Sequence, residues 1–155
     1  MSPIRAFIFC FFTFLATLVN AAPPAKIDWN DKELHWLSYE KGMSLLKNSG
    51  KQGILIVYAD WCGTCKAYSE FFKNPEVVKA LNGLVLMRAN ADKEPALSRK
   101  YGEDGEYVPR TFAVNSNGGI LKEAYERQGK FAYFIGADEP DDLLNFLKRV
   151  KAAKR

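Results

Sequence analysis

Histidine and cysteine are scarce in this sequence of 155 residues, which has one histidine and three cysteines. A structural zinc site needs four ligands, which are most often drawn from these two residue types. Cys10 lies in an apolar N-terminal run that we expect to be removed, which leaves Cys62, Cys65 and His35. These three residues do not complete a zinc site, and we expect His35 to be a surface or partly packed residue. We therefore expect no metal and no other cofactor.

Long hydrophobic runs are also missing. The apolar centre of the N-terminal segment, residues 6–19, is shorter than the roughly 20 residues that a membrane-spanning helix needs. It follows Arg5 and ends in the small residues Val19-Asn20-Ala21, a pattern typical of a secretory signal peptide cleaved after Ala21. We expect residues 1–21 to be such a signal; the alternative is an uncleaved anchor. After cleavage we expect no stable membrane association.

The chain has no strong excess of charge of either sign, with 22 basic and 18 acidic residues. Loss of the signal removes only Arg5 and leaves 21 basic against 18 acidic residues, which is no argument for a nucleic-acid partner.

The end of the chain bears on the compartment, because residues 151–155 are not a retention signal of the KDEL type. We therefore expect export, to a bacterial periplasm first and to the secretory pathway or extracellular space second.

The pattern of apolar residues predicts one α/β domain over residues 34–155, preceded by a flexible leader over residues 22–33 that contains Pro23-Pro24. A strand or turn should open the fold, because apolar residues recur between residues 29 and 37. The further expected elements, in order, are a helix from Ser38 to residue 50, a strand over 54–58, a helix to 74, a helix over 75–83, a strand over 84–87, a helix over 95–101, a hairpin of 111–114 with 120–122, and a helix opened by 138–142. This order predicts a mixed sheet with helices on both faces.

Two cysteines, Cys62 and Cys65, lie where the buried strand of residues 54–58 meets the start of a helix. The first N–H groups of a helix are unpaired and its dipole favours negative charge, so a thiolate is stabilised there. The spacing places the second sulfur one turn along the helix and close enough to form a disulfide. We expect Cys62 to be the nucleophile and the more buried Cys65 to be the resolving thiol. The alternatives are a static structural disulfide or half of a metal site.

The run Trp61-Cys62-Gly63-Thr64-Cys65-Lys66, with Val108-Pro109 further along the chain, resembles the thioredoxin superfamily. A narrower likeness is to small exported thioredoxin-like domains, which include endoplasmic-reticulum proteins related to the anterior-gradient group and bacterial periplasmic counterparts. The residues that carry this narrower likeness also include Ala67, Asp104-Gly105 and Tyr107-Val108-Pro109-Arg110. The likeness covers roughly residues 34–150. The resemblance implies a thioredoxin fold and thiol–disulfide exchange.

The resemblance also implies roles for the residues around Pro109. The matching proline in thioredoxin folds is cis and faces the disulfide, so the backbone of Val108 should pair with an extended substrate strand. The alternative is a trans proline that begins an edge strand. Arg110 departs from the threonine of thioredoxin proper; it either favours acidic substrate segments or is simply solvated.

Three residues of the cysteine motif complete the expected substrate-binding set. Trp61 is expected as a lid beside the thiols, with a core aromatic as the alternative, and Gly63 should let another chain approach closely. Thr64 replaces the proline of reducing thioredoxins and the histidine of isomerases, and so leaves the direction of electron flow open. Thioredoxins also carry a buried aspartate where this chain has Ile56, and a lysine where it has Arg88.

We therefore expect an exported thiol–disulfide oxidoreductase that acts on protein disulfides or thiols and has an upstream thiol redox partner. The competing interpretation is a thioredoxin-like module that binds clients or a partner subunit, with incidental redox activity. Four aromatic residues before the last helix are expected in the core, with a client-binding surface as the alternative: Tyr125, Phe131, Tyr133 and Phe134.

Overall fold

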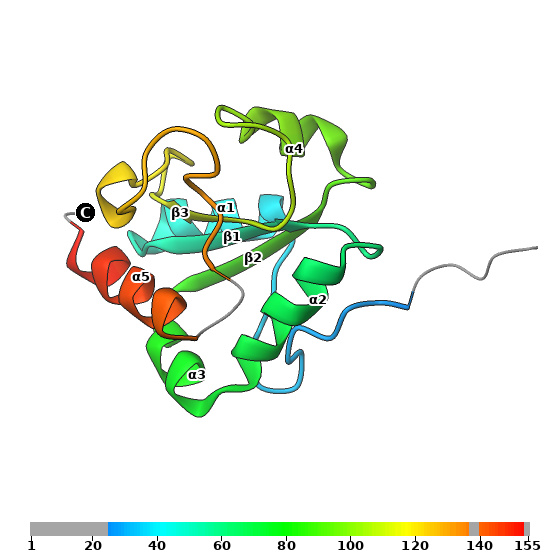
Figure 1. Ribbon diagram of the computed structural model, residues 1–155. Helices are drawn as coiled ribbons and strands as arrows, with labels where there is room; N and C mark the ends of the chain where they lie inside the picture. Colours follow the sequence, from blue (N-terminus) through cyan, green and yellow to red (C-terminus); the bar gives the residue numbers. More distant parts are fainter. Residues whose placement is uncertain (1–24, 137–139, 154–155) are drawn as a thin grey trace, which may run out of the picture.

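Three strands form a mixed sheet at the centre of the molecule (Figure 1). The central strand, β1 (Gly53–Tyr58), runs parallel to β2 (Val85–Asn90) on one side and antiparallel to β3 (Arg110–Val114) on the other. Every residue of β1 is buried, as expected for a strand covered on both faces. The computed structural model describes residues 25–136 and 140–153, so the predicted signal peptide lies outside the described residues.

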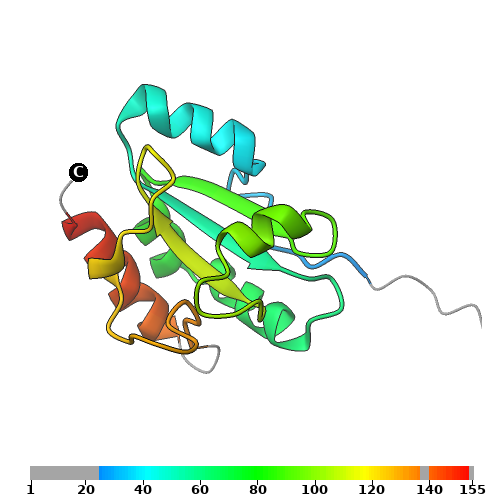
Figure 2. The ribbon, with the colours of Figure 1, turned by 90° about the horizontal axis from the view of Figure 1, so that it is seen from above.

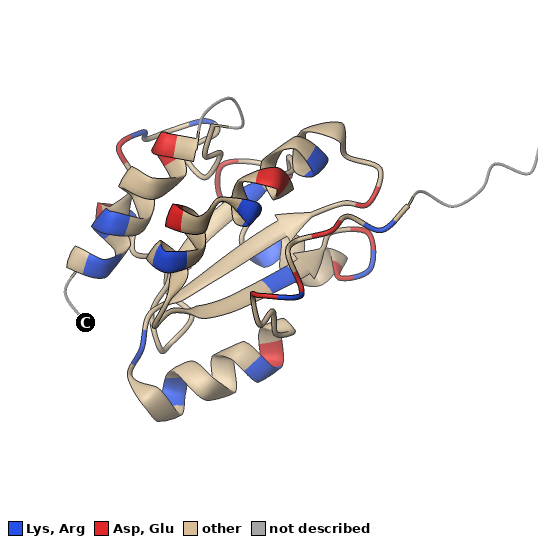
Figure 3. Cartoon of the chain, turned by 90° about the horizontal axis from the view of Figure 1, so that it is seen from below, with Lys and Arg blue, Asp and Glu red and all other residues tan. Residues whose placement is uncertain are grey.

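Helices cover both faces of this sheet, as the sequence predicts. Figure 2 shows α1 and α5 on opposite sides of it. The helical elements are α1 (Tyr39–Ser49), α2 (Gly63–Glu70) with the 3-10 turn η1 (Phe71–Lys73), α3 (Pro75–Leu81), α4 (Pro95–Lys100), the 3-10 turn η2 (Lys122–Ala124) and α5 (Pro140–Ala152). None of the described helices is long and apolar enough to cross a membrane. In Figure 3, basic and acidic residues are interspersed on the helices and loops.

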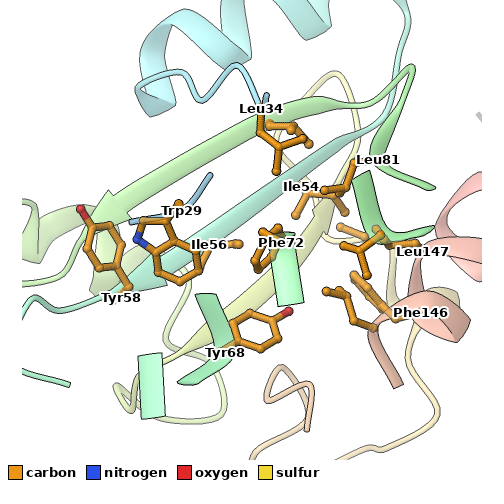
Figure 4. Close-up of a cluster of buried hydrophobic side chains, with 14 of the residues drawn as sticks. Trp29, Leu34, Ile54, Ile56, Tyr58, Tyr68, Phe72, Leu81, Phe146 and Leu147 are labelled. Atoms are coloured by element: carbon orange, nitrogen blue, oxygen red, sulfur yellow. The ribbon is translucent and has the colours of Figure 1, made fainter. Parts of the chain in front are cut away.

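Alternation along β1 divides the core into two layers. Ile54, Ile56 and Tyr58 belong to the layer that contains residues of α2, α3 and α5 (Figure 4). Leu55 and Val57 belong to the other layer, with residues of α1, β2 and β3. Because β1 is held from both faces and both edges, its carboxyl end is a rigid base for the segment that follows.

The domain begins earlier than predicted. Ile27 and Trp29 lie in the segment expected to be a flexible leader, yet both are buried, and Trp29 has no exposed surface. The Trp29 ring contacts those of Tyr58, Tyr68 and Phe72, with ring centroids 5.3, 6.3 and 5.6 Å away. Ile27 and Trp29 are therefore part of the core, whereas residues 25, 26, 28 and 31–33 are exposed.

The helix boundaries follow the predicted caps. The Ser38 side chain accepts a hydrogen bond from the Lys41 N–H, and Gly50 ends α1 with a positive φ of 62°. Asn74 accepts a hydrogen bond from the Glu76 N–H at the start of α3. The expected opening of the last helix at residues 138–139 lies outside the described residues, and α5 is described from Pro140 onward.

The expected opening strand and the second strand of the hairpin are reduced to single bridges in the described chain. Leu37 forms one parallel bridge with Met87, and Ile120 forms one antiparallel bridge with Val114. Elsewhere along β3, the Thr111 N–H donates to the carbonyl of Tyr133. The edges of the sheet are thus covered by irregular segments, which have no regular apolar alternation to reveal them in the sequence.

Candidate redox site

A disulfide between Cys62 and Cys65 lies at the junction of β1 and α2, with the two Cα atoms 5.2 Å apart. Cys62 is the N-cap of α2, and the Cys65 N–H points at the Cys62 sulfur from 3.0 Å. This donor is one of the unpaired N–H groups at the start of the helix, so it would stabilise a Cys62 thiolate once the disulfide is reduced. The predicted proximity of the two sulfurs is confirmed.

The two cysteines differ in how far solvent reaches them. Cys62 keeps 6% of its surface exposed, whereas Cys65 has none. The flanking residues Trp61, Gly63 and Thr64 are all exposed, so a partner can approach the disulfide from this side. This order of burial agrees with attack at Cys62 and resolution by Cys65, which remain predicted roles.

The Val108–Pro109 peptide bond is cis, as the resemblance implies, and the alternative of a trans proline is wrong. The Val108 carbonyl oxygen lies 3.7 Å from the Cys62 sulfur, so this loop and the start of α2 face each other. The two residues are 46 positions apart, and the resemblance, not a local pattern, predicted that this loop faces the disulfide.

A groove of about 420 Å³ runs between the cysteine motif and this loop. Among its lining residues are four of the predicted substrate-binding set, Trp61, Gly63, Thr64 and Val108. Sequence analysis did not assign the other five lining residues to the site: Ala91, Asp92, Ser98, Glu106 and Tyr107. A larger hollow of about 570 Å³, lined by residues between 103 and 133, does not include the cysteines.

Trp61 stands at the side of the groove with 66% of its surface exposed, so the alternative of a core aromatic is wrong. Its indole N–H donates to a carboxylate oxygen of Asp92 at 2.8 Å. The ring is thereby held beside Cys62 while most of its surface stays in solvent. Such an exposed and oriented aromatic surface is suited to contact with another chain.

Arg110 contradicts both sequence expectations, because it neither faces the groove nor is solvated. Its side chain is fully buried, and its guanidinium donates to the carbonyl oxygens of Ser98, Tyr101 and Gly105. Burial lowers the pKa of Arg110 from its usual value. The physical reason for the difference is that these carbonyls replace water at Nη1, although Nε is buried without a hydrogen-bond partner among the described residues. The contacts join segments apart in the sequence, so no local pattern reveals them.

A polar network lies at the carboxyl ends of β1 and β2. One oxygen of Asp60 accepts hydrogen bonds from the Asn90 amide at 3.0 Å and from the Lys93 ammonium at 3.2 Å. The other oxygen, Oδ1, is buried without a partner among the described residues. This network could have been predicted from the order of the strands. Parallel strands end at the same edge of a sheet, which brings Asp60 and Asn90 together.

The region behind the disulfide is apolar. Ile56 belongs to the same core layer as both cysteines and Tyr68, and burial raises the pKa of the Tyr68 hydroxyl well above its usual value, so it stays neutral. Arg88 is paired with Asp31 instead of lying behind the cysteines with an acid.

The aromatic residues before the last helix have mixed positions. Tyr133 is buried, and the Tyr125 ring packs against the rings of Tyr133 and Phe146. Phe131 is half exposed and packs edge-to-face against Tyr107, which lines the groove. Over residues 25–136 and 140–153, no group of three or more His, Cys, Asp or Glu residues could hold a metal ion.

Comparison with known proteins decides the family. A family model described as thioredoxin-like matches residues 35–116, which is more than half of the chain and includes both cysteines and the cis proline. The chain belongs to the thioredoxin-like family. The predicted fold class is confirmed with it.

Curated relatives of this thioredoxin-like chain are named for disulfide chemistry. Protein disulfide isomerase-like 2-1 of Oryza sativa subsp. japonica is 31% identical over 136 residues, which are 86% of this chain and 34% of that protein. The thiol:disulfide interchange protein DsbD of Escherichia coli K12 is 40% identical over 58 residues, which are 37% of this chain and 10% of that protein. The chain thus spans only about a third of the first relative's length and a tenth of the second's. Both names refer to disulfide chemistry, and this chain has a bonded cysteine pair at Cys62 and Cys65.

Solved structures show the same fold. A thioredoxin from Thermus thermophilus aligns with a TM-score of 0.58 at 17% identity, over 77% of this chain and 88% of that one. A disulphide isomerase from Xylella fastidiosa Temecula1 aligns with a TM-score of 0.56 at 20% identity, over 72% of this chain and 87% of that one.

Proposed function

We propose that the protein is an exported thiol–disulfide oxidoreductase that acts on disulfides of other proteins through Cys62 and Cys65. The observation that carries this proposal is the bonded pair at the start of α2, whose Cys62 sulfur faces both the Cys65 N–H and the Val108 carbonyl. A protein that only tethers a partner through a disulfide needs one cysteine, and a chaperone needs none. The intact pair therefore favours redox chemistry over a pure binding module.

The reaction has two exchange steps. The Cys62 thiolate attacks one sulfur of a substrate disulfide, which forms a mixed disulfide and releases the other substrate sulfur as a thiolate. The Cys65 thiolate then attacks the Cys62 sulfur, which closes the Cys62–Cys65 disulfide and releases the second substrate thiolate. The substrate gains two electrons and the protein loses two. An upstream thiol partner restores the dithiol by the same exchange.

Substrate binding follows from the groove. The Val108 backbone beside Cys62 is placed to pair with an extended segment of the substrate, and Trp61 offers an exposed ring at its side. Gly63 has no heavy atom within 4 Å of the position of an added Cβ, so another chain can come close there. Thr64 lies between the cysteines and does not determine the direction of electron flow.

Export is proposed from the signal-like pattern of residues 1–21. A bacterial periplasm is the first location we propose, and the secretory pathway or extracellular space the second. The oxidising conditions of such compartments suit a chain whose only cysteines after cleavage are the reactive pair.

The function is tested by reduction of insulin disulfides with dithiothreitol as the electron source. We expect turnover by the wild-type protein and none above background by Cys62→Ser. Equal rates for the two proteins, with binding of unfolded clients by both, would show that the chain is a binding module.

The groove also predicts which substrates react faster. Its charged lining residues, Asp92 and Glu106, are both acidic, and the positive charge of Arg110 is enclosed elsewhere. A cysteine peptide with flanking lysines should therefore react about two- to fivefold faster than one with flanking glutamates, as expected for exposed ion pairs. Added salt should weaken the preference.

Charge reversal at the groove gives the control for this preference. Glu106→Lys leaves one acidic and one basic lining residue, so it should bring the ratio of kcat/KM values for the two peptides close to one. Glu123→Lys, the same change at an exposed residue of η2 that does not line the groove, should leave the ratio unchanged. A ratio that both variants shift equally would mean that net charge, and not the groove, sets the preference.

A further inference from the structure

Arg110 is a buried cation without a carboxylate partner. It is the first residue of β3, directly after the cis proline, and pairs in register with Val57. No ion pair in the described part of the chain involves it. Burying a charge costs free energy unless polar groups replace the lost water. The hydrogen-bond acceptors around the Arg110 guanidinium therefore indicate which part of the chain this residue holds in place.

Those groups belong to a single loop and the helix before it. The guanidinium Nη1 lies 3.1, 3.0 and 3.0 Å from the carbonyl oxygens of Ser98, Tyr101 and Gly105. Nη2 donates to the Ser98 hydroxyl. The acceptors therefore span the end of α4 and the loop that continues to β3, and one side chain holds both.

Two aromatic rings also lie close to the guanidinium. Its central carbon lies 5.8 Å from the ring centroid of Tyr107 and 5.8 Å from that of Phe112. Tyr107 is itself tied to the loop, because its hydroxyl donates to Asp104 at 2.6 Å. The loop has little apolar core of its own, and these polar contacts take its place.

The same loop forms one wall of the redox groove. Ser98, Glu106, Tyr107 and Val108 line the groove, and the Val108 carbonyl faces the Cys62 sulfur at 3.7 Å. Arg110 touches none of the reacting atoms. Its hydrogen bonds instead determine where the wall opposite the cysteines lies.

We propose that Arg110 is a positioning residue of the redox site, which holds the loop of residues 101–109 so that the Val108 backbone faces a substrate segment bound at Cys62. This inference rests on the proposed function. Lysine replaces arginine only in part, because one ammonium can take the place of Nη1 among the three carbonyls but leaves no second nitrogen for the Ser98 hydroxyl. Arg110→Lys should therefore keep the charge and still release part of the loop.

The first test compares substrate binding with intrinsic thiol reactivity in the full-length protein. For Arg110→Lys and Arg110→Met we expect the KM for a disulfide peptide to rise by about tenfold or more, since a misplacement of about 1 Å is enough for such losses. The rate of Cys62 alkylation by iodoacetamide, and its dependence on pH, should stay unchanged because the Cys65 N–H that faces Cys62 is not altered. A variant that is merely destabilised would lose kcat in proportion to its unfolded fraction and keep its KM.

Arg88→Met is the matched control. Arg88 is also largely buried and paired, with Asp31, but it does not line the groove. We expect a lower melting temperature and an unchanged KM for this variant. An equal rise in KM for Arg88→Met and Arg110→Met, or a KM within twofold of wild type for both Arg110 variants, would overturn the proposal.

A second readout does not depend on the enzymatic activity. Amide hydrogen exchange of residues 106–108 should be at least tenfold faster in the Arg110 variants and unchanged in Arg88→Met, because only the former free the loop. If the wild-type protein reduces no disulfide, the proposed function fails. The rates of amide hydrogen exchange still decide in that case whether Arg110 holds the loop. Unchanged exchange in folded Arg110 variants would show that it does not.

Discussion

Replacing Cys65 with serine should convert the protein into a trap that stays bound to its substrates through Cys62. The first exchange step uses Cys62, whose sulfur is the accessible one of the pair. The second step needs the Cys65 thiolate, so without it the mixed disulfide persists and multiple turnover stops. Non-reducing electrophoresis after incubation with client proteins should show new bands that collapse to the monomer on reduction.

Cys62→Ser is the matched control for the trap, because it removes the other sulfur of the same pair. We expect no mixed disulfides from it, since Cys65 has no exposed surface. Alkylation of the reduced wild-type protein at mildly acidic pH should label Cys62 first, because the Cys65 N–H lies 3.0 Å from its sulfur and favours the thiolate. Faster labelling of Cys65 would reverse the two roles.

The parts of the fold that local patterns determine were predictable. The continuous apolar run of β1 identifies a strand buried on both faces, and Ser38 and Gly50 mark the two ends of α1. The cysteine spacing at the end of β1 locates the redox pair for the same reason, since strand, turn and helix start are consecutive in the sequence.

Two positions depend on contacts that no local pattern shows. Trp29 is expected to fold onto the domain, but its partners, rings from β1, α2 and η1, lie far from it in the sequence. Arg110 is expected to bind acidic substrate segments or to be solvated, and its side chain does neither. Only the path of the loop around it shows that its partners are carbonyl groups.

The apolar environment of Cys65 leads to an expectation about the second exchange step. The described chain buries six polar or charged residues, and none of them is an aspartate or glutamate. Ile56 occupies the position behind the pair where, by resemblance, thioredoxins have an acid, and it has no exposed surface. A thiol in apolar surroundings ionises reluctantly, so we expect release of the mixed disulfide to limit turnover.

Ile56→Asp should speed this release at neutral or higher pH, by supplying a base behind Cys65. Burial raises the pKa of the new carboxyl group, so the gain should be absent at low pH, where the group is protonated, and should appear as the pH rises through that pKa. The cost is stability, by about 2–7 kcal/mol for a buried polar group without a partner. Stopped-flow kinetics of mixed-disulfide release, in conditions where the variant is folded, measures the effect.

Two further variants decide what the acceleration means. Ile56→Asn places a side chain of nearly the same shape at this position but offers no titrating base, so it should lose stability without faster release. Asp60→Asn tests an alternative base, since Asp60 has one buried oxygen without a partner among the described residues. Slower release of the mixed disulfide in Asp60→Asn would show that Asp60 accepts the proton of the Cys65 thiol. Equal release rates for Ile56→Asp, Ile56→Asn and wild type would show that Cys65 needs no base behind it.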